Sequence, residues 1–148
     1  MPVVRDPKVE TGEDEIGAYT ATRLSDAGGL TQFGAFTETL EPGSRSSNLH
    51  WHASEDEFVY VLSGTITLVE GDIRTQMMPG MAATFKAGHP VGHQLENCSD
   101  QPVTYLVVGT RSHDDVVTYP ETGNIQTVKN GIKTLRDRHG TILKCSGS

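Results

Sequence analysis

Two histidines and a glutamate lie close together in the segment SNLHWHASEDEFVYVLSG, residues 47–64. His50 and His52 are two positions apart, so on a β-strand both imidazoles point to the same face. Glu57 shares a strand face with Val59 and turns toward the core if that valine does. A buried carboxylate needs a cation or strong hydrogen bonds, and a metal held by the two histidines would supply the cation.

A second interpretation is open for this segment, because a solvent-facing strand also explains two histidines at this spacing. Glu55 and Asp56 could replace Glu57 as the acidic ligand. The distance to Gly64 and the strand parity favour Glu57, and the other two carboxylates then belong to a solvated turn.

His93, in the segment VGHQLEN, is the best candidate for a fourth ligand. Three neutral imidazoles and one carboxylate suit one divalent Fe, Mn, Ni, Cu, Co or Zn ion. Such a set leaves one or two coordination positions open for water or substrate. The sequence therefore predicts a metal site formed by His50, His52, Glu57 and His93.

Two residues just before His93 are candidates for catalysis. His89 could reach the mouth of the site and act on substrate, and Lys86 could hold an anionic substrate. Arg45 is a further candidate for anion binding. An exposed loop position is an equally simple interpretation for each of them.

The elements that must position these side chains are short alternating runs. About nine strands are expected between residues 18 and 110, with turn signals every 8–12 residues, which is typical of an all-β sandwich or barrel. The expected strands occupy residues 18–24, 30–40, 49–52, 57–64, a hairpin over 65–78, then 79–85, 92–97 and 103–110.

Residues 111–148 differ from the rest, with weak periodicity and more positive charge. The segment IKTLRDR could be a short helix or an arm that packs on the barrel. The length predicts one domain over residues 1–148. We expect a barrel core at about 30–110, N-terminal strands within 1–29 and a C-terminal tail over 111–148.

The motifs resemble those of the cupin superfamily. Gly43, His50, His52, Glu57 and Gly64 fill the places of the first cupin motif, which is a glycine, His-x-His, a glutamate and a glycine. The resemblance implies a double-stranded β-helix, or jelly-roll barrel, of the small single-domain type.

The second cupin motif is similar to the segment GMAATFKAGHPVGHQLEN. Gly80, Gly88, His93 and Asn97 fill its places, and the resemblance implies that Asn97 bonds loop backbone. Lys86 stands where the family usually has proline, and two extra residues separate Gly88 from His93.

The cupin resemblance implies metal-dependent chemistry on a small polar metabolite. The chain is similar to a subgroup sometimes labelled sugar-phosphate isomerases, so an isomerase is the most specific expectation. A metal-dependent dioxygenase or lyase, and a non-catalytic cupin that binds a sugar or small acid, are alternatives. The residues select neither the substrate nor the metal.

Composition excludes several partners. The formal net charge is −7, which gives no electrostatic footprint for nucleic acid. No apolar run approaches the roughly 20 residues of a membrane span, and no apolar signal segment is present, so a cytoplasmic location is expected. Cys98 and Cys145 are expected to be free thiols. Exposed strand edges predict a homodimer.

Overall fold

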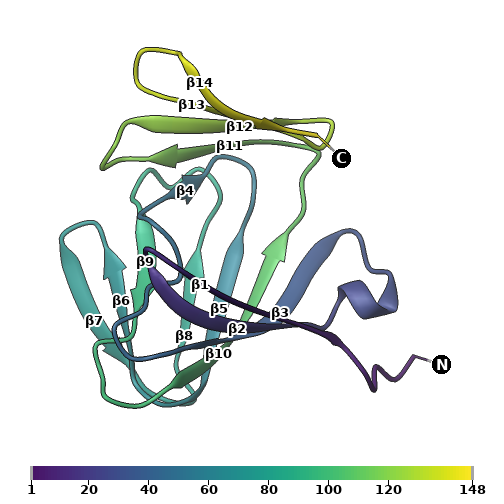
Figure 1. The fold of residues 1–148 in the computed structure, drawn as a ribbon, viewed down its shortest axis with the longest axis vertical. Helices are drawn as coiled ribbons and strands as arrows, with labels where there is room; N and C mark the ends of the chain where they lie inside the picture. Colours follow the sequence, from purple (N-terminus) through teal and green to yellow (C-terminus); the bar gives the residue numbers. More distant parts are fainter. Residues whose placement is uncertain (1, 148) are drawn as a thin grey trace.

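Alternating side chains produce fourteen β-strands and one short 3-10 helix in residues 2–147, the part of the chain that the computed structural model describes (Figure 1). In chain order the elements are β1 (Lys8–Asp14), β2 (Gly17–Arg23), η1 (Asp26–Gly28), β3 (Phe33–Leu40), β4 (Trp51–His52), β5 (Glu57–Ser63), β6 (Ile66–Glu70), β7 (Ile73–Met77), β8 (Ala82–Phe85), β9 (His93–Glu96), β10 (Val103–Thr110), β11 (Asp114–Tyr119), β12 (Asn124–Lys129), β13 (Ile132–Arg136) and β14 (Ile142–Ser146).

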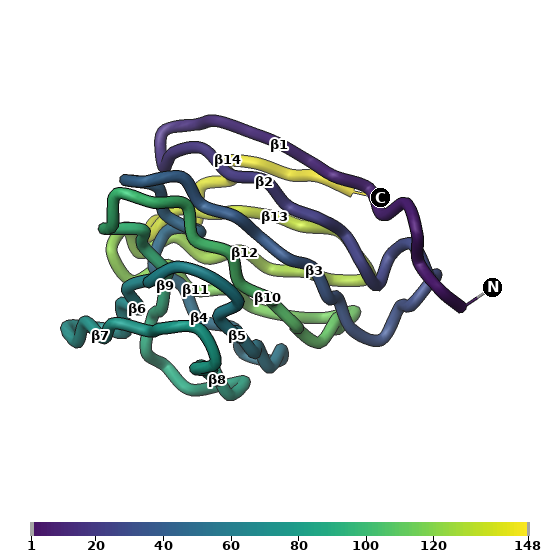
Figure 2. Tube along the Cα trace, turned by 90° about the horizontal axis from the view of Figure 1, so that it is seen from below, coloured from purple at the N-terminus to yellow at the C-terminus, as the bar shows by residue number. Residues whose placement is uncertain are grey.

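The barrel is built from two antiparallel sheets. A six-stranded sheet has the order β1-β2-β3-β10-β5-β8, and a three-stranded sheet has the order β7-β6-β9. Figure 2 shows the larger sheet curving from β1 through β3 and β10 to β8. Nine strands lie within residues 17–110, which confirms the predicted all-β fold and the number of strands in this segment.

Period-two alternation places the core between these sheets. On β5, Val59 and Val61 are buried while Phe58 and Tyr60 are exposed, as strand geometry requires. The buried apolar side chains form one cluster: Leu40, Val59, Val61, Ile66, Met77, Ala83, Phe85, Leu95, Val103 and Tyr105. The face of β5 that carries the two valines therefore also directs Glu57 inward.

Residues 111–147 form a sheet, and the alternative of a short helix in IKTLRDR is wrong. The third sheet has the order β14-β13-β12-β11-β4, and Figure 1 shows it as a layer at one end of the barrel. Strand β13 is paired on both sides, with β12 and with β14. A short helix gains no such partners, so the two ladders decide the conformation of this segment.

Strand β4 joins this C-terminal sheet to the barrel. In the β4–β11 pair, His52 lies opposite Val117 and Trp51 lies opposite Thr118. The N–H of Ala53 also donates to the carbonyl of Val116 at 2.9 Å. The predicted His-x-His segment is thus held by a strand that lies more than 60 residues further along the chain.

Loops around the barrel confirm the predicted role of Asn97 and explain the glycine at position 64. The Asn97 amide donates to the carbonyls of Leu40 at 2.9 Å and Gln101 at 2.8 Å, so it does bond loop backbone. Gly64 has a φ of 81°, and a Cβ there would lie 2.9 Å from the carbonyl oxygen of Pro102, which explains a glycine at this position of the motif.

The two cysteines are free, as predicted, and both are exposed. Within residues 2–147 the structure contains no helix that is long and apolar enough to span a membrane.

Candidate metal centre

Backbone pairing positions the predicted ligands. His52 is on β4, and Glu57 begins β5. His50 precedes β4 and forms an isolated bridge with His93, the first residue of β9, in which the N–H of His93 donates to the carbonyl of His50 at 3.0 Å. The backbone therefore fixes all four positions before any side-chain contact is considered.

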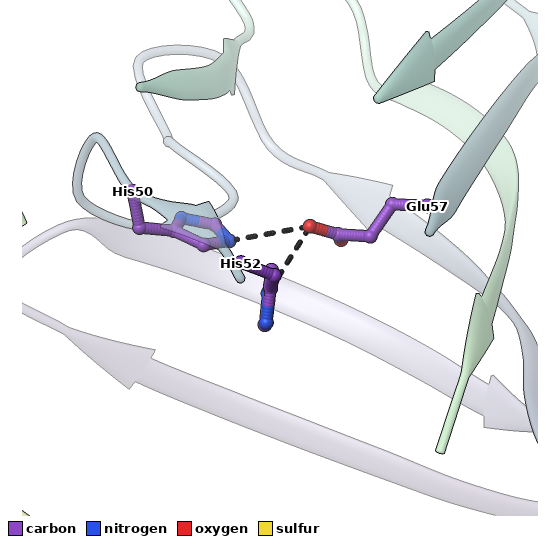
Figure 3. A group of neighbouring side chains, drawn as sticks. All are labelled: His50, His52 and Glu57. Atoms are coloured by element: carbon purple, nitrogen blue, oxygen red, sulfur yellow. Dashed lines mark ion pairs between the residues drawn. The ribbon is translucent and has the colours of Figure 1, made fainter. Parts of the chain in front are cut away.

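The side chains converge on one oxygen atom of Glu57. Its Oε1 lies 3.0 Å from Nε2 of His93, 3.2 Å from Nε2 of His52 and 3.6 Å from Nε2 of His50. Figure 3 shows His50 and His52 directed toward this carboxylate. All four side chains are at least three-quarters buried. The structure thus brings together the four residues that the sequence singles out.

The chemistry of this donor set fits a divalent metal ion. Nitrogen and oxygen atoms that share a metal at about 2.1 Å lie about 3 Å or slightly more apart, which is the spacing seen here. Among the four, His50, His52 and Glu57 offer ligand atoms that all lie within 4.8 Å of one another. Coordination by the four residues stays a prediction.

Neighbouring groups hold each of the three imidazoles, at Nδ1 for His50 and His52 and on the ring face for His93. Nδ1 of His50 lies 2.9 Å from the carbonyl oxygen of Asn48, and Nδ1 of His52 lies 2.7 Å from Oδ2 of Asp115. The ring of His93 stacks on Phe85, with the ring centres 3.7 Å apart. A ring whose Nδ1–H is donated presents the Nε2 lone pair, which is the form that binds metals.

Hydrogen bonds within the cluster shift the ionisation of Glu57 and His52 in opposite directions. Burial alone would raise the pKa of Glu57, but hydrogen bonds from His50, His52 and His93 outweigh it and hold the pKa well below the usual range. Burial also lowers the pKa of His52, but hydrogen bonds to Glu57 and Asp115 outweigh it and raise the pKa to about 9. A cation at this place is therefore electrostatically favoured, whether it is a proton or a metal.

The other two acidic candidates have different partners. Glu55 accepts a hydrogen bond from the backbone of Ser112, and Asp56 accepts one from the backbone of Ala87. Glu55 approaches His52 only at Nδ1, at 3.5 Å. The strand-parity argument for Glu57 over these two residues agrees with the geometry.

Two adjoining hollows lead to the cluster. A cavity of about 780 Å³ and an inner space of about 20 Å³ share Glu57, Phe85, Lys86 and His89 in their linings. His52 and His93 line the inner space. Lys86 and His89 thus line both hollows, whereas Arg45 lines a separate hollow of about 280 Å³ beside Tyr119.

Sequence reasoning missed Asp115, which touches the candidate centre. Its side chain is 2% exposed and contacts His52, 63 residues away in sequence. The signal that could have found it is the alternation in DDVVTY, where Asp115 shares a strand face with the buried Val117. Its distance from the His-x-His segment hid the connection.

The fold and the site define a small jelly-roll protein with a candidate three-histidine, one-glutamate centre. Residues 36–109 match the family model described as Cupin domain. The match covers half of the chain and includes the four candidate ligands, so the chain belongs to the cupin family.

Two solved structures resemble most of this chain. A cupin-superfamily protein from Silicibacter pomeroyi, called a sugar phosphate isomerase, is 40% identical with a TM-score of 0.80, and the match covers 85% of this chain and 80% of that one. A protein from Acidithiobacillus ferrooxidans, named as a candidate sugar phosphate isomerase, is 32% identical with a TM-score of 0.82, covering 89% and 86%.

A curated relative resembles about half of this chain. Oxalate decarboxylase OxdC of Bacillus subtilis (strain 168) is 31% identical over 85 residues. The match spans 51% of this chain and only 20% of the relative, so it concerns one segment of a much longer protein.

Proposed function

We propose that this protein is a metal-dependent enzyme that isomerises a small phosphorylated sugar. The observation that carries the proposal is the convergence of three imidazole Nε2 atoms on Glu57 Oε1 beside an open cavity. The names of the two structural relatives support the choice of an isomerase and a sugar phosphate.

The four candidate ligands and the cavity residues have different proposed roles. His50, His52, His93 and Glu57 would hold the ion, which when bound supplies Lewis-acid polarisation of a carbonyl or hydroxyl oxygen. Phe85 packs against His93 and lines the hollows, so it keeps water from one side of the centre.

Lys86 and His89 are suited to the substrate itself. Among the described residues that line the two hollows, Lys86 is the only lysine or arginine, so it is the group for a phosphate. His89 lines both hollows and is a candidate general base, able to take the proton from C2 and return it to C1, while the proton of the C2 hydroxyl passes to the C1 carbonyl oxygen.

A metal-dependent lyase is a second candidate function. The similarity of about half of the chain to an oxalate decarboxylase favours it, and a small dicarboxylate would also use Lys86. That relative is much longer than this chain, so we rank the lyase below the isomerase.

Turnover by purified protein of known metal content tests the proposal. We expect interconversion of an aldose phosphate and a ketose phosphate, followed by NMR, and a KM raised at least tenfold in Lys86→Met. The unphosphorylated sugar serves as the matched control, because its KM should not respond to Lys86→Met. Release of CO2 from a small dicarboxylate would support the lyase instead, and binding without turnover would contradict both activities.

A further inference from the structure

The C-terminal sheet reaches the candidate metal centre through one buried carboxylate. Asp115 is on β11, outside the segment that matches the cupin domain. Its Oδ2 lies 2.7 Å from Nδ1 of His52, and its Oδ1 accepts the backbone N–H of Ser54 at 2.8 Å. Both oxygens are thus used, and both bonds go to the segment that carries His52.

The backbone beside this contact is also fixed by the C-terminal sheet. His52 lies opposite Val117 in the β4–β11 pair, and Ala53 bonds to Val116. On its other side, the carbonyl of His52 accepts the N–H of Gly88 at 2.8 Å. The imidazole of His52 can therefore change its orientation only by breaking its bond to Asp115.

We propose that Asp115 is a positioning residue for the metal, acting through His52. It accepts the Nδ1–H of that ring and thereby holds the tautomer whose Nε2 lone pair faces Glu57. The inference rests on the proposed function in one respect, because it assumes that the four-residue cluster binds a metal ion. It adds that the sheet formed by β11–β14 contributes a residue, Asp115, to the site.

Glu55 provides a matched comparison for the role of Asp115. Both carboxylates lie near Nδ1 of His52, but Asp115 is at hydrogen-bond distance, whereas Glu55 is at 3.5 Å and bonds Ser112 instead. Replacing either one with its amide removes one negative charge next to the same ring. Only Asp115→Asn turns a hydrogen-bond acceptor into a donor at Nδ1, which moves the ring proton to Nε2 and blocks coordination there.

The test is titration of the metal-free full-length protein and both variants with Co²⁺, followed by its visible absorption, and with Zn²⁺ by competition. We expect the dissociation constant to rise about 10- to 100-fold in Asp115→Asn. It should stay within about threefold of the wild-type value in Glu55→Gln. The thermal midpoint of metal-free Asp115→Asn should be lower than that of the wild type, because the His52 ring loses the buried carboxylate that stabilises its charge, so circular dichroism must show that the variant is folded at the titration temperature.

Two results overturn the inference while leaving the proposed function intact. One is wild-type affinity in Asp115→Asn, and the other is an equal loss in Glu55→Gln, which would make charge rather than hydrogen bonding the cause. Wild-type protein that binds neither ion would overturn the proposed function and this inference with it.

A second measurement needs no variant and keeps the inference testable if Asp115→Asn fails to fold. Long-range proton–nitrogen NMR of the Zn²⁺-loaded wild type should show a protected Nδ1–H on His52, with zinc on Nε2. Zinc on Nδ1, or an Nδ1–H that exchanges as freely as that of an exposed histidine, contradicts the role of Asp115.

Discussion

Glu57 is the carboxylate on which the three imidazoles of the candidate centre converge. Its carboxylate is mostly buried and faces three imidazoles, each within 3.6 Å of the same oxygen. Without a cation, this group would pay the full desolvation cost of a buried charge. The three histidines therefore serve the fold and the proposed chemistry together.

Replacing either histidine of the His-x-His pair should abolish metal retention. In His50→Ala or His52→Ala one imidazole ligand is lost, so metal affinity should fall by more than the roughly 10- to 100-fold that loss of an outer partner causes, and the purified variants should not retain stoichiometric metal. Elemental analysis of the purified variants measures this, with circular dichroism to check that the barrel is folded. His113→Ala, at an exposed position, is the control. Stoichiometric metal in both variants would make the ligand assignment wrong.

A partly buried carboxylate away from the centre, Glu38, should make stability depend on pH. Burial raises the pKa of Glu38 from its ordinary value of 4.5, and the hydrogen bond from Tyr105 and the charge of Arg23 offset this only in part. Since the folded-state pKa exceeds the unfolded one, this group stabilises the protein below about pH 4.5, and that contribution is lost as the pH rises through the folded value.

Glu38→Gln should therefore raise the thermal midpoint at pH 7 by a few degrees and change it less at pH 4. The amide is uncharged, has nearly the same shape and still accepts from Tyr105. Calorimetry of both proteins in the presence of a chelator measures the difference, because the metal site then contributes equally to each. A larger gain at pH 4 than at pH 7 would reverse the sign of the linkage and refute the prediction.

Strand parity within one segment identified three residues of the centre. His50, His52 and Glu57 fall within eight positions, where the period of two decides which side chains share a face. Asp115 reaches His52 through the pairing of β4 with β11, and no local period specifies which distant strands will pair.

At the scale of elements, β4 is the critical connection. It has only two residues, so its own ladder contributes little, and it depends on β11 for pairing. The predicted barrel strands were found because they alternate clearly and end at turns. The last two strands, β13 and β14, were not predicted. β14 is exposed at all five positions and β13 has no buried residue, so neither shows a hydrophobic face.

Barrel and C-terminal sheet should unfold together, as the prediction of one domain requires. Trp51 is the only tryptophan and lies on β4, so its fluorescence reports on the connection, whereas far-ultraviolet circular dichroism reports on all the strands. The two denaturation curves should coincide in urea. Val117→Ala, at a buried position on β11, should shift both curves equally and lower the free energy of unfolding by about 2 kcal/mol. Separate transitions would show two independently folding units.

At the scale of the whole molecule, one face of the barrel carries no charge although the chain has a net charge of −7. This outer face is defined by the side chains of β8, β5, β10 and β3 that point away from the core. Strand register places them side by side: Ala82, Thr84, Phe58, Tyr60, Leu62, Leu106, Val108, Ala35 and Thr37. Phe58, Tyr60 and Leu62 are all more than one-third exposed, so they form an apolar stripe open to solvent.

The homodimer stays a prediction, and this outer face is where we expect it to form. Two copies that meet at Tyr60 and Leu62, away from the Phe58 end of the face that lines the 780 Å³ cavity, would bury apolar side chains without opposing any like charges. Sedimentation should give a mass of twice 16.0 kDa for the wild type. Tyr60→Lys combined with Leu62→Glu places charges at exposed positions, so it should yield a folded monomer.

Ile73→Lys is the matched control for that variant, because Ile73 is 67% exposed on β7, in the other barrel sheet. It should sediment like the wild type. If the double variant remains dimeric, the partner copy binds at another face, and the unpaired edge of β1 becomes the next surface to examine. A monomeric wild type at micromolar concentration would instead leave the outer face without a partner copy and refute the dimer itself.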